Sequence, residues 1–255
     1  NAGSAVTDLK TKAIKDGDGF RVTGSKVFTS NSPDADIFLV YVRYHEGLDG
    51  IGSVLMDTSM EGFSKGKPSR YTNGEEWCAL YFDNVFVPKE NVLLGPGGFK
   101  KQITGFNAER IGNTARSLAL GEYAFNVARE HALTREQFGK KLCEFQGIQW
   151  KFSEMKIKID AGRLLLYRAA MTADKGFPSS HETSIAKAFC NEAGFYICNE
   201  AMQVMGGMGY SEESLVEYCF RKSRGWQIAG GSTEMMKNRI AEDIFERRFS
   251  QRPNK

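Results

Sequence analysis

Few side chains of this sequence are suited to binding a transition metal or to forming disulfides. The 255 residues include only three histidines, which are widely separated, so a zinc site is not expected. The five cysteines are scattered without a C-x-x-C pair, at positions 78, 143, 190, 198 and 219. Their odd number and wide spacing favour reduced thiols in a compartment like the cytosol.

Long apolar runs and an excess of one charge sign are also missing. No apolar run approaches the ~20 residues of a membrane span, and no signal peptide is visible. Lys and Arg number 34 against 31 for Asp and Glu, a net charge of +3. That near-balance provides no electrostatic case for binding nucleic acid or an anionic membrane. A hydrophobic content of 41% over this length is sufficient for a substantial core in one or two domains.

The N-terminal part of the chain, residues 1–94, has the pattern of β structure. Asp16-Gly17-Asp18-Gly19 is a strong turn signal between two short strands. The β-branched and aromatic residues of 36–42 predict a buried strand. Residues 80–87 have the pattern of a hairpin that turns at Asp83-Asn84 and is ended by Pro88. Short strands at this spacing indicate a barrel-like or sandwich domain.

The hydrophobic period changes after Gly95-Pro96-Gly97-Gly98, which is the expected domain boundary. Apolar residues then recur at helical spacing over 111–128 and over 148–166. A third helix is expected to end near Gly206 and a last one to cover 232–247, with a polar link before Trp226. Long antiparallel helices of this kind form a bundle. The sequence therefore predicts an α+β chain, with a β-barrel-like or sandwich domain over residues 1–94 and an antiparallel helical bundle over residues 97–250.

Two glycine-rich segments interrupt the helical part. They read Gln203-Val-Met-Gly206-Gly207-Met-Gly209-Tyr210 and Trp226-Gln-Ile-Ala-Gly230-Gly231-Ser232-Thr233-Glu234. Glycine lets the backbone approach a ligand closely, and a helix that begins after a glycine turn presents free N–H groups to an anion or a polar ring. The plain alternative is that both segments are helix ends with glycine caps.

The order of these segments resembles the acyl-CoA dehydrogenase family. The matching motifs are Arg135-x-x-Phe138-Gly139, the Gln203–Tyr210 segment, and Gln227-Ile228-x-x-Gly231-Ser232. The resemblance runs from residue 1 to about residue 248. In that family a helical domain normally precedes the β-domain, so we expect this chain to be an acyl-CoA dehydrogenase fold without its N-terminal helical domain.

By this resemblance, one glutamate removes the proton α to the acyl thioester carbonyl. Most members place it directly before the Gly-Thr or Gly-Ser of the last motif, where this sequence has Gly230. A minority, including the long-chain and isovaleryl-CoA dehydrogenases, carry it before an arginine early in the long helix, and Glu109-Arg110 matches that position. On periodicity alone, Glu109 is a solvated residue off the apolar stripe. A carboxylate needs desolvation to take such a weakly acidic proton.

The resemblance also implies FAD, because no side chain of the sequence can accept the hydride that leaves the β-carbon. Arg135 is expected to contact the FAD pyrophosphate across a subunit interface, where a guanidinium suits phosphate oxygens; a surface arginine is the alternative. Phe28 replaces the family's tryptophan beside the flavin, and Glu234 replaces a glutamine. The positions that match cofactor contacts are Phe28, Thr29, Ser30, Arg135, Gln137, Phe138, Phe145, Gln146, Gln203, Gly206, Gly207, Ser232 and Glu234.

Five positions match contacts with the acyl-CoA substrate: Ser4, Phe106, Arg110, Ala229 and Gly230. The main-chain N–H of Gly230 is expected to donate to the thioester carbonyl oxygen as negative charge develops there. Arg110 is expected to point away from the base, toward a phosphate or an acidic neighbour. Ala229 and Gly230 replace bulkier residues of the family, which favours acyl chains that are bulky near the α- or β-carbon.

The sequence thus indicates an FAD-dependent acyl-CoA dehydrogenase that forms a homotetramer and passes electrons to an electron-transfer flavoprotein. A bacterial cytoplasm or the mitochondrial matrix is the expected location. Two alternatives keep the fold: an acyl-CoA oxidase, and an enoyl-CoA reductase similar to the carnitine-pathway reductases, which also carry a Gly-Gly-Ser type of last motif. A third alternative is a non-enzymatic flavin-binding or assembly subunit, against which Glu109 argues.

Overall fold

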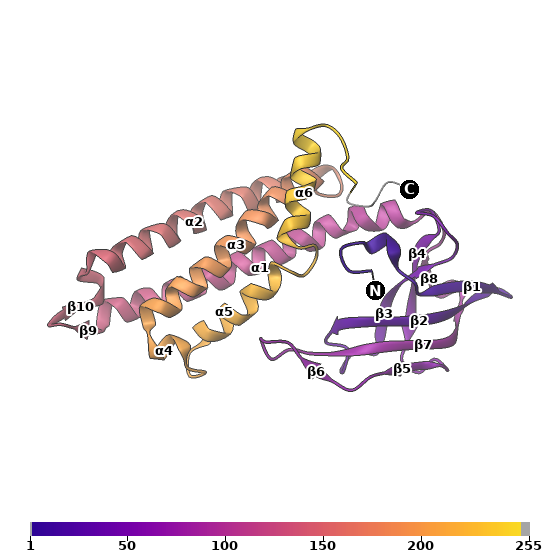
Figure 1. The fold of residues 1–255 in the computed structure, drawn as a ribbon, viewed down its shortest axis with the longest axis horizontal. Coiled ribbons are helices and arrows are strands. Elements are labelled where there is room, and N and C mark those ends of the chain that lie inside the picture. The colour runs from indigo at the N-terminus through magenta and orange to yellow at the C-terminus, as the bar shows by residue number, and fades with distance from the viewer. Residues whose placement is uncertain (1, 251–255) are drawn as a thin grey trace. The chain divides into compact units, whose positions relative to one another are not determined.

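The computed structural model describes residues 2–250, except for the side chain of Lys175. Asn1, the first residue of the expected β-domain, lies outside the described residues. The chain divides into two compact units between Ile103 and Thr104. The boundary expected at residues 94–97 precedes this division. A sheet unit is followed by a helical unit (Figure 1), as the sequence predicts for the α+β class.

The first unit is built on one eight-stranded sheet, in which strands β5, β7, β2, β1, β3, β4 and β8 follow one another and β6 pairs with β7. The strands are β1 (Lys12–Asp16), β2 (Gly19–Ser30), β3 (Ile37–Arg43), β4 (Ile51–Asp57), β5 (Phe63–Lys65), β6 (Ser69–Arg70), β7 (Glu76–Pro88) and β8 (Val92–Leu94), with the 3₁₀ turns η1 (Val6–Asp8) and η2 (Lys89–Asn91). The expected turn at residues 16–19 is confirmed, because Asp16 pairs with Gly19 in the β1–β2 hairpin.

The hairpin expected over residues 80–87 is wrong. These residues belong to the single strand β7, which pairs antiparallel with β2 along most of its length. Asp83 and Asn84 form a bulge there: Val22 pairs with Val85, whereas Gly24 pairs with Phe82. The N–H of Asn84, whose φ is 54°, points to the Thr23 hydroxyl at 3.3 Å. The turn-favouring pair therefore bends the strand without reversing it.

The strand expected over residues 36–42 is present as β3, but only one of its faces is buried. Phe38, Val40 and Val42 lie in the core of the sheet unit, whereas Ile37 is 64% exposed and Leu39 is 49% exposed. A continuous apolar run predicts burial on both faces, but the antiparallel sheet covers only one of them.

The second unit is a helical bundle (Figure 1). Its elements are α1 (Phe99–Thr134, which begins in the first unit), β9 (Glu136–Gln137), β10 (Lys140–Lys141), η3 (Leu142–Glu144), α2 (Gln146–Met171), η4 (Thr172–Lys175), α3 (Ser180–Met205), α4 (Gly207–Tyr210), α5 (Leu215–Trp226) and α6 (Thr233–Ile244). Helix α3 packs against α2, α5 and α6. It also meets α1 closely, because a Cβ atom at Gly194 would lie 2.4 Å from the Ser117 carbonyl oxygen.

The polar link expected before Trp226 is wrong, because residues 215–226 form α5. Ser214 accepts a hydrogen bond from the N–H of Val216 and caps this helix. Val216 and Cys219 are buried against the bundle, while charged residues occupy the other face. The apolar stripe of this helix contains only two or three residues, so the sequence pattern of the segment is mostly polar. Packing against α3 buries that stripe in the structure.

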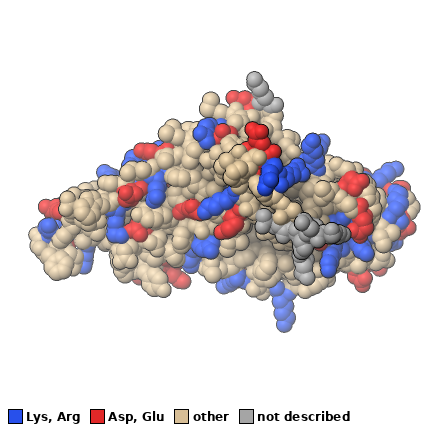
Figure 2. Space-filling model, turned by 45° about the horizontal axis from the view of Figure 1, so that its top comes forward, with Lys and Arg blue, Asp and Glu red and all other residues tan. Residues whose placement is uncertain are grey.

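Charges of both signs are interspersed on the face of the molecule shown in Figure 2. This distribution matches the near-balance of acidic and basic residues in the sequence. Among the described residues, no helix combines the length and apolar character that crossing a membrane requires.

Candidate active site

Glu109 lies on α1, five residues after the helical unit begins at Thr104, and its side chain is exposed. One turn further on, Asn113 is 2% exposed, and its amide Nδ2 donates to Glu109 Oε1 at 3.3 Å. Residues four apart lie above one another on a helix, so both side chains project from the same face of α1. The structure thus holds one oxygen of the carboxylate by a hydrogen bond from its own helix.

The loop between α5 and α6 runs toward this face of α1, and α3 anchors it. Lys187 Nζ and Asn191 Nδ2 both donate to the Trp226 carbonyl oxygen, at 2.9 and 2.6 Å. Gln227 in turn donates from Nε2 to the carbonyl oxygen of Asn191 at 3.3 Å. Two donors on one carbonyl fix the position at which the glycine loop begins.

Gly230 is the point where this loop meets α1. Its carbonyl oxygen accepts from Arg110 Nε at 3.1 Å, and its φ is 68°. A Cβ atom at Gly230 would lie 2.8 Å from Asn113 Nδ2 and 3.7 Å from Glu109 Oε1. The structure therefore brings Glu109 and Gly230 together.

No ion pair between Arg110 and an acidic side chain is found within the described residues, and the alternative expectation, contact with a phosphate, stays a prediction. Besides the Gly230 carbonyl, its guanidinium donates from Nη1 to Asn107 Oδ1 at 3.1 Å. Burial lowers the pKa of Arg110, as does the nearby Arg239, while Glu109 opposes both effects. Arg110 lies beside Phe106, with 6.0 Å between the guanidinium carbon and the ring centroid.

Lys187 is the largest fully buried side chain of the described residues, with 1% exposure. Burial lowers its pKa to about 8, mainly because the charged form is desolvated; Arg110 lowers it further and Glu109 raises it. The buried ammonium is held by the Trp226 carbonyl, at the base of the glycine loop.

The lowered pKa of Lys187 has a measurable consequence for stability. Between about pH 8 and pH 10.5 the unfolded chain holds this proton and the folded chain releases it. The free energy of unfolding that Lys187 contributes therefore rises with pH in this window, by up to about 1.4 kcal/mol per pH unit, and is constant below it. In urea-unfolding series at pH 7, 8, 9 and 10, we expect Lys187→Met to lose this rise. The pKa of Lys26 is also lowered to about 8, but Lys26 is present in both proteins, so its contribution cancels in the difference between the two pH profiles. Parallel pH profiles would contradict the prediction.

The start of α6 completes this part of the structure. Ser232 caps the helix, since its hydroxyl accepts from the N–H of Met235 at 3.4 Å. Glu234 is exposed, and its pKa is lowered by hydrogen bonds from its own backbone N–H and from Ser232. Ala229, the preceding loop residue, is exposed. Seven of the predicted residues, namely Phe106, Glu109, Arg110, Ala229, Gly230, Ser232 and Glu234, thus lie in one region of the helical unit.

A second group of predicted residues lies at the opposite end of the bundle, around the β9–β10 hairpin (Figure 1). Phe138 at its tip is 95% exposed and has a φ of 53°. At a rise of about 1.5 Å per residue along α1, Thr134 is about 38 Å from Glu109. The two groups cannot touch one reacting centre in the same chain. The members of this second group are Arg135, Gln137, Phe138, Phe145, Gln146, Gln203, Gly206 and Gly207.

The remaining predicted residues belong to the sheet unit. Ser4 is exposed before η1, and Phe28, Thr29 and Ser30 end β2. Phe28 is 64% exposed, has a φ of 56°, and its ring lies 4.7 Å from that of Trp77. Tyr71 supports this strand end, because its hydroxyl donates to the Phe28 carbonyl oxygen at 2.9 Å.

Asn113, Lys187 and Asn191 were not singled out from the sequence. All three are polar residues inside helices, and each is at most 2% exposed. A signal was available for the two asparagines, because asparagine is unfavourable inside a helix unless its side chain has a specific partner. Among the described residues, no group of His, Cys, Asp and Glu is arranged to hold a metal ion.

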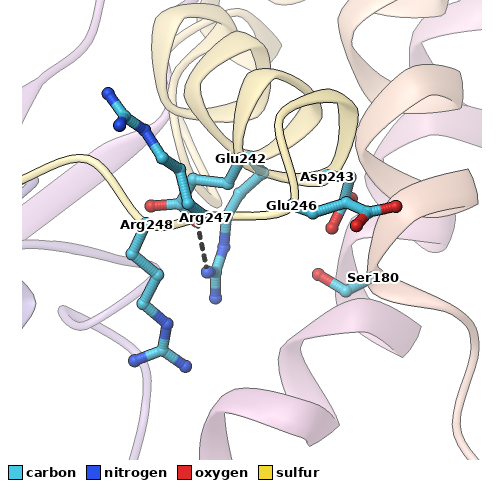
Figure 3. Close-up of a pocket in the computed structure, with 7 residues that line it drawn as sticks. Ser180, Glu242, Asp243, Glu246, Arg247 and Arg248 are labelled. Carbon is cyan, nitrogen blue, oxygen red and sulfur yellow. Dashed lines mark hydrogen bonds and ion pairs between the residues drawn. The ribbon is translucent and has the colours of Figure 1, made fainter.

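A hollow on the surface of the helical unit lies elsewhere, between the C-terminal part of α6 and the start of α3. Ser180, Glu242, Asp243, Glu246, Arg247 and Arg248 line it, and Figure 3 shows Asp243 and Glu246 beside Ser180, whereas the side chains of Arg247 and Arg248 extend away from it. Charges of both signs line it, and none of the predicted site residues does.

Two family models match this chain, and together they cover most of its length. The family model for the acyl-CoA dehydrogenase middle domain matches residues 1–85, and that for the acyl-CoA dehydrogenase C-terminal domain matches residues 96–245. The short-chain specific acyl-CoA dehydrogenase of Megasphaera elsdenii is 36% identical over 241 residues, which are 92% of this chain and 63% of the relative. The mitochondrial short/branched chain specific acyl-CoA dehydrogenase of Rattus norvegicus is 35% identical over 248 residues, 95% of this chain and 57% of the relative.

The fold has solved counterparts as well. The structure of butyryl-CoA dehydrogenase from Megasphaera elsdenii superimposes with a TM-score of 0.90 at 34% identity, covering 96% of this chain and 66% of that one. The chain therefore spans about two thirds or less of the length of these relatives.

Proposed function

The chain belongs to the acyl-CoA dehydrogenase family, and on that premise we propose that the protein oxidises an acyl-CoA thioester to the trans-2-enoyl-CoA, with Glu109 as the base and FAD as the hydride acceptor. The resemblance stated from the sequence is confirmed. Members of this family are FAD-dependent oxidoreductases.

The observation that carries the proposal is the approach of Glu109 to Gly230. A Cβ atom at position 230, where most of the family carries the base, would lie 3.7 Å from Glu109 Oε1. A carboxylate on α1 thus reaches the place that a glutamate on the loop would otherwise serve. A Cβ atom at position 230 would approach Asn113, Glu109 and Lys187. Of these three residues, Glu109 is the one with a carboxylate, and Gly230 itself has no side chain.

In the proposed reaction, Glu109 takes the proton from the α-carbon and the electron pair of that bond forms the new double bond. FAD, when bound, would supply the two-electron acceptor for the hydride of the β-carbon. The main-chain N–H of Gly230 has no acceptor within residues 2–250 and is free to donate to the thioester oxygen as it gains charge. Glu109 is exposed in this chain, so the bound acyl group and the cofactor would exclude water from it.

Three exposed features fit an FAD shared between copies of the chain. Arg135 is exposed at the end of α1, beside the fully exposed ring of Phe138. At Gly207, φ is not positive and a Cβ atom would have nothing within 4 Å, so contacts within the chain do not require glycine there. A ligand or neighbour that approaches the backbone closely would require it. The distance of about 38 Å along α1 between these residues and Glu109 supports a cofactor held by two copies.

A stripe of exposed apolar residues on α2 supports an oligomer. Trp150, Ile157, Leu164 and Met171 recur every seven residues and are 62–71% exposed. Heptad spacing places them along one seam of the helix, the pattern of helices that pack against one another in an assembly. We infer that this α2 seam is covered in a homotetramer, with an electron-transfer flavoprotein as a further, transient partner.

The purified protein is expected to be yellow from non-covalent FAD, and anaerobic addition of acyl-CoAs should bleach the flavin absorbance. Short and α- or β-branched chains are expected to bleach it fastest, given the small residues Ala229 and Gly230 and the similarity to short/branched chain specific relatives. Protein that cannot be reconstituted with FAD, or that no acyl-CoA bleaches, would contradict the proposed function.

One second function has a specific observation in its favour. The Gly230-Gly231-Ser232 segment has the form found in the carnitine-pathway enoyl-CoA reductases. In that case the chemically reduced flavin would be reoxidised rapidly by an enoyl-CoA and only slowly by an electron-transfer flavoprotein. Rapid reoxidation by oxygen would instead indicate an acyl-CoA oxidase. We propose a bacterial cytoplasm or mitochondrial matrix as the location, in keeping with relatives from both sources.

A further inference from the structure

Asn113 is a buried amide in the interior of α1, and the proposed chemistry does not use it. It is 2% exposed, and a polar group this deeply buried is costly unless it is hydrogen-bonded. Its Nδ2 donates to Glu109 Oε1 at 3.3 Å, and its Oδ1 accepts from Arg116 Nη1 at 3.5 Å. The amide therefore connects a buried position to the carboxylate proposed as the base.

The same amide limits what position 230 can hold. A Cβ atom at Gly230 would lie 2.8 Å from Asn113 Nδ2, closer than side-chain atoms normally approach. Asparagine has a short side chain, and this one is 2% exposed and hydrogen-bonded to both Glu109 and Arg116, so it has little room to withdraw. The φ of 68° at Gly230 adds a second restriction on any larger residue.

We propose that Asn113 is a positioning residue, which favours a catalytic base on α1 and disfavours one at position 230. Its carboxamide orients the Glu109 carboxylate toward the reacting carbon and occupies the space in which a side chain at position 230 would begin. This inference rests on the proposed function of Glu109 for its kinetic part, while its steric part concerns packing alone.

The orienting role follows from how a base works. A glutamate on a helix surface samples many rotamers, and a hydrogen bond to one oxygen restricts them before substrate arrives. Lys187 and Arg110 lie beside the same position but donate to the carbonyl oxygens of Trp226 and Gly230. Asn113 is the side chain found to donate to Glu109 within the described residues.

The kinetic test replaces Asn113 by leucine, which has a similar volume and no donor. We expect kcat per bound flavin to fall about 10- to 100-fold with KM changed little, because the base is present but poorly aimed. The isotope effect with α-deuterated acyl-CoA should grow in this variant, since proton abstraction becomes slower than the other steps. Ser117→Ala, which removes a buried hydroxyl one turn further along α1, is the matched control and should leave both unchanged.

The steric test is a thermodynamic cycle that does not depend on activity. Gly230→Ala should lower Tm in the wild-type background, and at least about half of that decrease should disappear in the Asn113→Ala background. The backbone strain that a positive φ imposes on alanine at position 230 is the same in both backgrounds. The difference between the two decreases of Tm therefore measures the contact with the Asn113 amide.

The outcomes separate this inference from the proposed function. If Asn113→Leu keeps wild-type kcat and isotope effect while Glu109→Gln is inactive, the orienting role is wrong and the proposed base stands. If Glu109→Gln keeps its activity, the proposed base is wrong, whatever Asn113 does. An equal decrease of Tm in both backgrounds would overturn the steric part.

Discussion

Glu109→Gln is expected to bind acyl-CoA and FAD normally and to lose turnover by roughly 10³- to 10⁴-fold, the loss typical of a proton acceptor in the transition state. The amide keeps the size and shape of the side chain and can still meet the Asn113 amide across the 3.3 Å contact through its oxygen. Only the ability to take a proton is lost. Stopped-flow bleaching of the flavin by the best acyl-CoA measures this step directly.

Glu130→Gln is the matched control, because Glu130 is an exposed glutamate on the same helix, and within the described residues its carboxylate pairs with the neighbouring Arg129. It should bleach at the wild-type rate. Near wild-type turnover of Glu109→Gln would show that another group is the base. If acyl-CoA binding is lost together with turnover, the variant has damaged the pocket, and the rate of bleaching at saturating substrate decides between the two causes.

The double substitution Ile157→Glu and Leu164→Glu is expected to convert the oligomer to monomers and to release FAD. Both residues lie on the α2 seam, 62% and 71% exposed in the single chain. Burying two side chains of this size contributes about 1.5–3 kcal/mol each, and the same burial in every copy multiplies the effect. Two carboxylates placed in a dry interface would instead have to be desolvated, which costs several kcal/mol. Light scattering and flavin absorbance measure the two consequences.

Lys156→Glu is the control for this pair of substitutions. It changes the charge of the chain by the same amount, but Lys156 is exposed off the seam and loses only a surface ion pair with Asp160 at 2.7 Å. It should remain oligomeric and yellow. If the Ile157/Leu164 variant also keeps its size and its flavin, the seam is not an interface. If it becomes monomeric but retains FAD, the cofactor is not shared between copies.

Sequence patterns alone located most of the regular elements of this chain. The turn at residues 16–19 and the helices over 146–171 and 180–205 depend on neighbours within a few positions. Hydrophobic period, glycine at helix ends and a hydroxyl before a helix act locally, so they are visible without the fold. The position of Glu109 came from the order of family motifs, and the structure places it next to Gly230.

Other features were decided by contacts between distant segments. Strand β7 runs through Asp83-Asn84 because β2 pairs with it on both sides of the bulge, although the local signal is a turn. Helix α5 forms because α3 covers its narrow apolar stripe. In both places, long-range pairing outweighs a local preference worth about 1 kcal/mol or less.

The candidate site illustrates the same division most clearly. The sequence supplies Glu109 and Gly230 but contains no sign that Asn113 lies between them, because those residues are brought together only when the α5–α6 loop is anchored to α3 by Lys187 and Asn191. Periodicity reports which face of a helix is apolar; it does not report which buried amide meets which loop. That depends on packing at atomic distances, where one Cβ atom decides whether position 230 accepts a side chain.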